Sequence, residues 1–263
     1  CSTRRVFMTP LVDFVRTTPF FVVAHRGASG DAPENTLAAI RRAVDGGANM
    51  VEIDLQLTLD RKLVVFHDHV LGRTTDGHGK IAATSFDDVR KLDAGSWFAS
   101  SFAGERVPTF AEVVDVVRNR AYVLVELKPF DAQATVDDVR AVVTTVQEFG
   151  LGPYMAFASF DHRTIAFVKH LDATLHTVAL NVPGDLRPPS EVCAAVGADA
   201  YGCSIHELSR DRMADARRNR IPVGVYTVND ETSLRRACSY GVQAVVSNFP
   251  SVIRDAALQI CQQ

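Results

Sequence analysis

The stretch that decides the fold runs from Val51 to Asp68 and reads VEIDLQLTLDRKLVVFHD. Apolar and polar residues alternate over 51–57, which predicts a strand with two different faces. A second, solidly apolar strand covers 63–66, and the polar residues 60–62 predict the turn between the two. We therefore expect a hairpin whose first arm has one apolar face and one polar face.

Two carboxylates share the polar face of the first arm. Glu52 and Asp54 are two positions apart, so their side chains point the same way on a strand. Carboxylates buried together repel each other and lose hydration, which must be offset by a cation or relieved by protonation. The second arm brings His67 and Asp68 just past its end. Acids on one strand beside an imidazole on its neighbour are typical of a metal-assisted active site.

The composition suits one large domain. A chain of 263 residues with 47% hydrophobic residues can bury a large core, and α/β barrels reach this length undivided. The net charge of −3 gives no sign of a surface for nucleic acid or an anionic membrane. No apolar run approaches the roughly 18 residues that a membrane span requires, and no signal peptide is visible. We predict a single domain over 1–263 without a nucleic-acid partner or a transmembrane segment.

The five cysteines are odd in number, widely spaced and without a CxxC pair; they are Cys1, Cys193, Cys203, Cys238 and Cys261. This pattern predicts reduced or buried thiols, in preference to a disulfide framework or a zinc site. Cys1 leaves the compartment open. A mature bacterial lipoprotein begins with cysteine, so a processed Cys1 would mean a lipid-anchored or exported form. Trimming of the chain explains the same residue, and a cytoplasmic location is the default expectation.

Strand and helix patterns alternate along most of the chain. Strands are expected to begin near residues 20, 51, 122, 155, 174, 198, 223 and 243, with helices between them. Eight parallel strands with alternating helices predict a TIM (β/α)8 barrel, and an open doubly wound sheet is the alternative. The pattern loosens over 69–109, which we interpret as a small insertion after the second strand that could act as a lid. Three aromatic residues there could line an entrance or pack within the insertion: Trp97, Phe98 and Phe102.

Reactive side chains gather where the expected strands end, which is where barrels place catalytic groups. Besides the hairpin residues, these strand ends carry His25, Arg26, Glu126, Lys128 and Tyr226. Three carboxylates without a cysteine ligand suit a hard cation, Mg²⁺ or Ca²⁺, better than zinc. Arg26 and Lys128 could contribute to this site, or they could form structural ion pairs, Arg26 with Glu34 or Asp54 and Lys128 with Glu126.

Seven short motifs follow one another along the chain: HRG at 25–27, PENT at 33–36, EID at 52–54, HD at 67–68, RTT at 73–75, PT at 108–109 and ELK at 126–128. In their order and spacing the chain resembles the glycerophosphodiester phosphodiesterases, and the resemblance covers nearly its whole length. Two later positions depart from the family pattern, since Tyr226 replaces a Trp and Asn248 replaces an Asp. Both departures concern the fit of the substrate more than the reaction.

The resemblance implies a barrel with a small insertion that splits glycerophosphodiesters into sn-glycerol 3-phosphate and an alcohol. It implies one divalent cation on Glu52, Asp54 and Glu126, an acid/base pair of His25 and His67, and substrate contacts from Arg26, Lys128 and Tyr226. Imidazoles with pKa values near neutrality can both give and take a proton, as that reaction requires. Which histidine is the acid stays open, as does the nucleophile, which is either the neighbouring glycerol hydroxyl or water.

Other functions remain alternatives. A phospholipase-D-like enzyme would use the same chemistry on lysophospholipid or sphingomyelin, and a non-catalytic barrel would only bind its ligand. His67 and His69 also match the HxH pattern of metal-dependent amidohydrolases, but the later histidines of this chain do not fall on strand ends. The head group, the choice between Mg²⁺ and Ca²⁺ and the oligomeric state are not fixed by the sequence.

Overall fold

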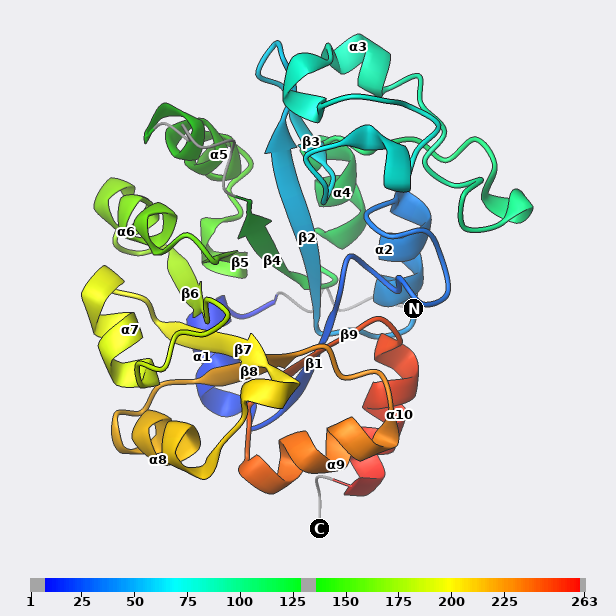
Figure 1. Ribbon diagram of the computed structural model, residues 1–263. Coiled ribbons are helices and arrows are strands. Elements are labelled where there is room, and N and C mark those ends of the chain that lie inside the picture. The colour runs from blue at the N-terminus through cyan, green and yellow to red at the C-terminus, as the bar shows by residue number, and fades with distance from the viewer. Residues whose placement is uncertain (1–7, 129–135, 261–263) are drawn as a thin grey trace, which may run out of the picture.

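Eight parallel strands close into a barrel (Figure 1). The structure is a computed structural model that describes residues 8–128 and 136–260. Around the barrel the order is β1-β2-β4-β5-β6-β7-β8-β9, and β9 pairs with β1 to close it. These strands are β1 (Phe21–Ala24), β2 (Met50–Leu57), β4 (Tyr122–Leu127), β5 (Met155–Ser159), β6 (His176–Leu180), β7 (Ala200–Ser204), β8 (Val223–Tyr226) and β9 (Ala244–Ser247). The predicted TIM barrel is confirmed, and the open doubly wound alternative is wrong.

The remaining strand, β3 (Leu63–Val65), forms the predicted hairpin with β2. The two strands are antiparallel, with Leu55 opposite Val65 and Leu57 opposite Leu63. Because β2 also pairs with β1 and β4, it is one of the strands of the barrel wall. Its last residues extend past the wall and pair with β3. The hairpin therefore delivers residues 66–68 to the same end of the barrel at which β1 and β4 finish.

Helices surround the barrel (Figure 1). They are α2 (Leu37–Asp45), α4 (Phe110–Val117), α5 (Val136–Glu148), α6 (His162–Leu171), α7 (Pro189–Val196), α8 (Arg210–Arg218), α9 (Glu231–Tyr240) and α10 (Pro250–Ile260). Side-chain caps begin several of them. Thr36 accepts from the Ala39 backbone at the start of α2, and Thr109 forms a capping box with Glu112 at the start of α4. Among the described helices, none is long and apolar enough to cross a membrane.

A short helix, α1 (Leu11–Thr17), covers the amino-terminal end of the barrel. The ring of Phe14 packs on Phe21 and Tyr122, with centroid distances of 5.1 and 4.5 Å. No local pattern predicted α1. It is only seven residues long and has no side-chain cap, so its local signal is weak and its packing on the barrel holds it.

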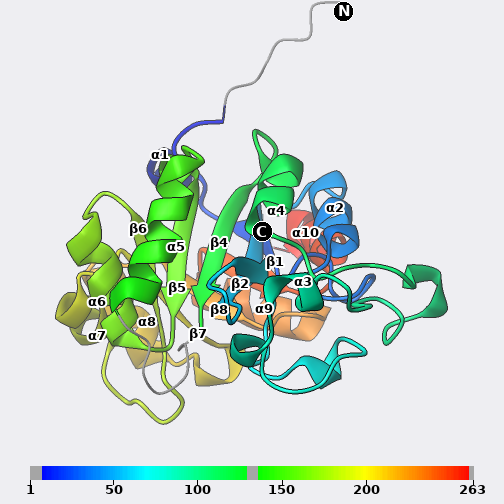
Figure 2. The same cartoon turned by 90° about the horizontal axis from the view of Figure 1, so that it is seen from above.

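The chain between β3 and α4 forms a small lobe with its own apolar cluster. It contains α3 (Phe86–Val89) and three short 3₁₀ turns: η1 (Leu71–Arg73), η2 (Ile81–Ala83) and η3 (Ser100–Phe102). The apolar cluster consists of Val64, Phe66, Leu71, Ile81, Val89, Ala94 and Val107. In Figure 2 this lobe and α1 lie toward opposite ends of the barrel. The aromatic residues of 97–102 pack edge to face on one another, with Trp97 41% exposed.

The cysteine prediction is only partly correct. Cys193 and Cys203 are free and buried, as expected. Cys238, however, is disulfide-bonded. Cys1 and Cys261 lie outside the described residues. A disulfide depends on which cysteines the fold brings within bonding distance, and spacing along the chain does not reveal that.

Candidate active site

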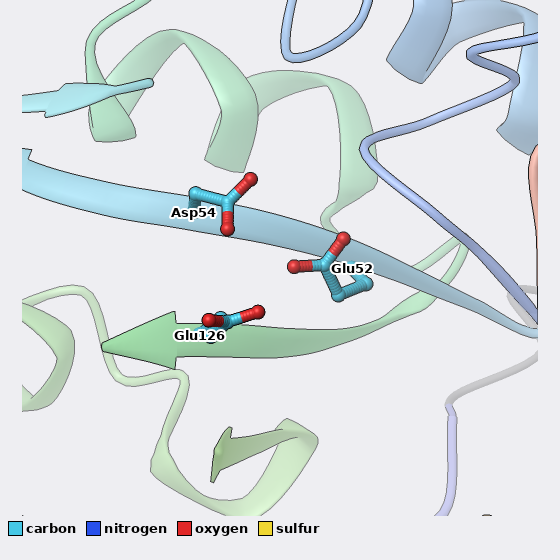
Figure 3. Close-up of side chains that lie close together, drawn as sticks. All are labelled: Glu52, Asp54 and Glu126. Carbon is cyan, nitrogen blue, oxygen red and sulfur yellow. The ribbon is translucent and has the colours of Figure 1, made fainter. Parts of the chain in front are cut away.

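Three carboxylates converge from the middle of β2 and the end of β4 (Figure 3). The register places Asp54 opposite Glu126, and Glu52 lies one pleat earlier on the same face of β2. One carboxylate oxygen from each residue lies within 4.8 Å of the others. Asp54 and Glu52 are 0% and 4% exposed, and the Glu126 side chain is 12% exposed. Oxygens this close and this buried can coordinate one cation together.

Two basic side chains lie against these carboxylates. Arg26 Nε is 3.3 Å from Asp54 Oδ2, while Lys128 Nζ is 2.9 Å from Asp54 Oδ1 and also contacts Glu126. The ion pairs considered from the sequence as an alternative to phosphate contacts are therefore present in this structure. Two cations against three carboxylates still leave one negative charge. Among the described residues, Glu52 Oε1 has no hydrogen-bond partner.

The pKa values of the three acids follow from this incomplete compensation. Burial raises the pKa of Glu52 well above its ordinary value, and the charges of Asp54 and Glu126 raise it further. Burial, followed by Asp54, also raises the pKa of Glu126. Burial alone would raise the pKa of Asp54 too, but Lys128 and Arg26 hold it below its usual range. A set of oxygen donors short of positive charge fits Mg²⁺ or Ca²⁺.

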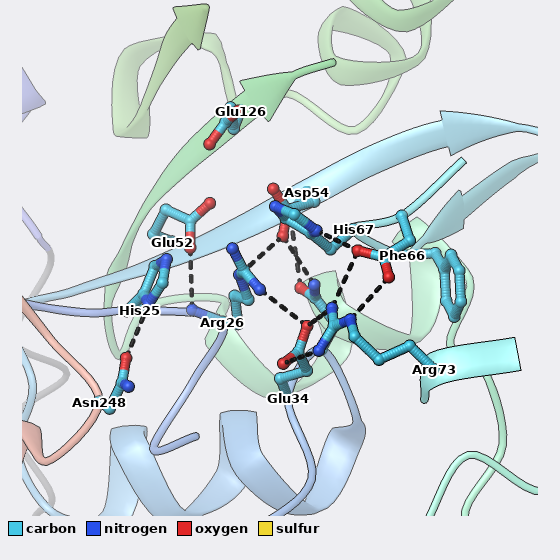
Figure 4. A network of polar contacts seen from close by, with 12 residues as sticks. His25, Arg26, Glu34, Glu52, Asp54, Phe66, His67, Arg73, Glu126 and Asn248 are labelled. Carbon is cyan, nitrogen blue, oxygen red and sulfur yellow. Dashed lines mark hydrogen bonds and ion pairs between the residues drawn. The ribbon is translucent and has the colours of Figure 1, made fainter. Parts of the chain in front are cut away.

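His25 follows β1 on one side of the carboxylates (Figure 4). Its Nδ1 is 2.7 Å from Asn248 Oδ1. An amide oxygen only accepts, so with the amide in this orientation Nδ1 carries the hydrogen and Nε2 is left with a free lone pair. Burial, followed by the charge of Arg26, lowers the pKa of His25 to about 4. The imidazole is therefore neutral at neutral pH and able to accept a proton.

His67 lies on the other side, past the end of β3 (Figure 4). Its Nδ1 is 2.5 Å from Asp68 Oδ1. Arg73 binds Asp68 with two hydrogen bonds of 2.6 and 2.9 Å, and it binds Glu34 with two more of 2.7 and 2.9 Å. These bonds hold the pKa of Asp68 below its usual range. His67 is thus oriented by a carboxylate, whereas His25 is oriented by an uncharged amide.

Sequence reasoning missed several residues that position this site. Arg73 was noted only as part of a motif, but it donates to Glu34. Glu34 also accepts from Arg26, so it connects the His67 side of the site with the His25 side. Asn35 was noted only as part of the PENT motif, but its Nδ2 donates to Asp54 Oδ2 at 2.7 Å, while Thr36 caps α2. The backbone of Asn35 is in the left-handed region, with a φ of 57°, and no local sequence pattern predicts that conformation.

Gln56 also escaped prediction. Its Nε2 donates to the backbone oxygens of Phe66, His67 and Asp68, at 3.2, 2.8 and 2.6 Å. The amide therefore fixes the loop that carries His67. The sequence signal for this role was that Gln56 is polar and lies on the same face of the strand as Glu52 and Asp54.

Tyr226 ends β8, and its ring lies edge to face with Phe160 at 6.0 Å. Among the described residues it makes no hydrogen bond with the carboxylates or with either histidine. Burial raises its pKa, so the phenol stays protonated at neutral pH. Its predicted contact with substrate therefore stays a prediction.

The fold and the site together define a (β/α)8 barrel with a buried carboxylate cluster that could hold a cation, between two oriented imidazoles. Residues 25–252 match the glycerophosphoryl diester phosphodiesterase family. The chain belongs to that family and is a phosphodiesterase.

Individual relatives agree over nearly the full length. A glycerophosphodiester phosphodiesterase of Caldanaerobacter subterraneus is 30% identical over 237 residues, which are 88% of this chain and 95% of that protein. A phosphodiesterase of Oleispira antarctica, solved with its product sn-glycerol-3-phosphate, has a TM-score of 0.84 and 30% identity, covering 92% of this chain and 97% of that one. A glycerophosphodiester phosphodiesterase structure from Agrobacterium tumefaciens has a TM-score of 0.79 and 28% identity, covering 90% and 99%.

Proposed function

We propose that this protein hydrolyses glycerophosphodiesters to sn-glycerol 3-phosphate and an alcohol, with Mg²⁺ or Ca²⁺ bound by Glu52, Asp54 and Glu126. The observation that carries the proposal is the buried carboxylate cluster with its unpartnered Glu52 oxygen, flanked by two oriented imidazoles. When bound, the cation would supply positive charge against the phosphate oxygens, whose negative charge grows in the transition state.

The two histidines are proposed to transfer protons. A phosphodiester cleavage removes a proton from the nucleophile and gives one to the departing alkoxide. His25 is neutral and presents Nε2, so it can accept a proton. His67 Nδ1 is hydrogen-bonded to Asp68, which holds the ring beside the carboxylates, and we assign His67 the role of proton donor.

Arg26 and Lys128 are proposed to bind the phosphate. In this structure both contact Asp54. Their remaining N–H groups lie at the same strand ends as the histidines, so they can contact an anionic oxygen placed over the carboxylates.

The direct test is an assay of the purified protein with glycerophosphocholine and Mg²⁺ or Ca²⁺. We expect release of glycerol 3-phosphate, which stops with EDTA and returns when the metal is restored. His25→Ala and His67→Ala should each remove most of the activity, because each deletes one proton transfer worth about 10²–10⁴-fold. His170→Ala is the matched control, since this residue lies on α6 away from the cluster.

The outcomes separate the alternatives. Release of a head group from lysophospholipid or sphingomyelin, without release from any glycerophosphodiester, would replace the proposed substrate class. No hydrolysis of any of these esters in either metal would overturn the proposal.

A further inference from the structure

The interior of the barrel is hollow on the side of β5 to β9, near the end covered by α1. A cavity of about 390 Å³ lies there. Barrel interiors are normally filled by layers of bulky branched side chains. Four strands here instead line the space with very small residues: Ala156, Gly202, Gly224 and Ala244. The sequence therefore leaves open a volume that a typical barrel fills.

The walls of this cavity are apolar. Leu11 and Val15 of α1 line one side, and Phe21, Met50 and Val246 line the barrel side. Two uncharged polar side chains of the lining already have hydrogen-bond partners. Gln243 donates to the Val15 and Thr18 backbone, and the Tyr201 hydroxyl donates to Asn181.

Its size is that of a ligand site. Ligand pockets typically measure about 300–1,000 Å³. An apolar cavity of only about 150 Å³ is already enough to bind benzene. The carboxylates and histidines of the candidate active site do not line this space, whereas Tyr226 does. The cavity is therefore distinct from the carboxylate cluster, and it extends from α1 to Tyr226 at the last residue of β8.

Two arginines line the cavity where it opens between α1 and the strands. Arg16 and Arg220 are exposed, and within 8–128 and 136–260 neither forms an ion pair. The acid at this opening, Asp199, is already bound by Lys169 at 2.6 Å. His176 also faces Asp199, at 3.9 Å. The opening therefore has two uncompensated guanidinium groups beside an apolar space.

We propose that this end of the barrel binds a single-chain amphiphile with an anionic head group. The alkyl chain occupies the apolar cavity, and a carboxylate or phosphate monoester contacts Arg16 and Arg220. Guanidinium groups match the geometry of both anions. The volume suits one chain, not two. This proposal goes beyond the phosphodiesterase activity and does not depend on it.

The test is calorimetric titration of the whole protein with decanoate, decyl phosphate and decanol, each below its aggregation concentration. We expect saturable binding of one molecule per chain for both anions, and binding of decanol at least about tenfold weaker. Tighter binding of decanoate would identify fatty acids as the source of the ligand. Tighter binding of decyl phosphate would identify single-chain phospholipids. Equal affinity for decanol and the anions would overturn the proposal.

Two sets of variants place the ligand. Gly224→Val should abolish binding by filling the cavity: a Cβ there would lie 3.5 Å from Ala244, in ordinary contact, and valine suits a strand. Ala244→Leu is a second filler from the neighbouring strand, in case the first variant does not fold. The double substitution Arg16→Gln with Arg220→Gln should lower the affinity for the anions to that for decanol.

Arg41→Gln, an exposed arginine on α2, is the matched control and should bind like the native protein. Circular dichroism and the melting temperature show that each variant is folded. No saturable binding by the native protein, or unchanged affinity in a folded filler or in the double arginine variant, would overturn the proposal.

Discussion

Glu52 is the least compensated side chain of the carboxylate cluster. Its Oε2 accepts from the Arg26 backbone at 2.8 Å, but among the described residues its Oε1 has no partner. It is buried beside two residues of the same charge, Asp54 and Glu126. A buried charge left without a partner costs stability, so its presence is better explained by ligand binding than by folding.

Replacing this carboxylate should stabilise the metal-free protein. Glu52→Gln keeps an oxygen for the Arg26 N–H and removes one charge, so we expect the free energy of unfolding at neutral pH to rise by about 1–3 kcal/mol. Urea denaturation with EDTA present measures it. The same substitution at Glu148, which is exposed on α5, should change little. A destabilised Glu52→Gln protein would contradict this account.

Arg73 is predicted to position His67 through Asp68. Arg73→Gln removes the paired hydrogen bonds to Asp68 and Glu34, and kcat should fall roughly tenfold to a hundredfold, as when other partners that orient site residues are lost. KM should change little. Arg73→Lys keeps the charge but loses the fork geometry, so its kcat should lie between those of the native protein and of Arg73→Gln. Steady-state kinetics on the preferred glycerophosphodiester measure both variants, and unchanged kcat in Arg73→Gln would refute this role.

At the scale of elements, β2 joins the fold to the site. Its inner face carries the two acids and Gln56, while Ile53 and Leu55 are fully buried in the apolar core. The same strand pairs with β1, β3 and β4, which carry or deliver the other site residues. One element therefore fixes the distance between the carboxylates and both histidines.

The start of α4 connects the lobe to the barrel. The contribution of its cap to the free energy of unfolding should be measurable by itself. Thr109 caps the helix and pairs with Val64 of β3 in the hairpin. Thr109→Ala should lower the free energy of unfolding by about 1 kcal/mol, whereas Thr109→Ser keeps the capping oxygen and should cost less. Chemical denaturation compares them. Equal stability of Thr109→Ala and the native protein would show that the cap contributes nothing.

The barrel strands and their helices were predictable because each carries a local period. The alternation over 51–57 places Glu52 and Asp54 on one face, and the order of strands brings Glu126 beside them. Contacts between distant segments carry no such period. Asn248 on His25 and Asn35 on Asp54 join residues 223 and 19 positions apart. The disulfide of Cys238 was missed for the same reason.

Across the whole molecule, the apolar core divides into two large clusters. One lies under β2, β4 and β5, and the other under β7, β8 and β9. Cys193 and Cys203 belong to the second cluster. Burial raises the pKa of each thiol to about 12.

These two thiols should react only when the second cluster opens. With a pKa near 12, roughly one thiol in ten thousand is ionised at pH 8, and raising the pH to 9 should still leave both unreactive. Mass spectrometry of alkylated peptides measures each site separately. We expect labelling of both to follow unfolding as denaturant is added. Rapid labelling of either cysteine in the folded protein at pH 8 would contradict the packing described.

The most direct measurement of the central claim is calorimetric titration of the metal-free protein with Mg²⁺ and with Ca²⁺. The account predicts one ion per chain for at least one of the two metals. Glu52→Gln, Asp54→Asn and Glu126→Gln should each weaken its binding by about a hundredfold or more, because each removes a charged oxygen ligand, while Glu148→Gln binds normally. Undiminished affinity in all three variants, or no binding of either metal by the native protein, would contradict a cation site formed by these carboxylates.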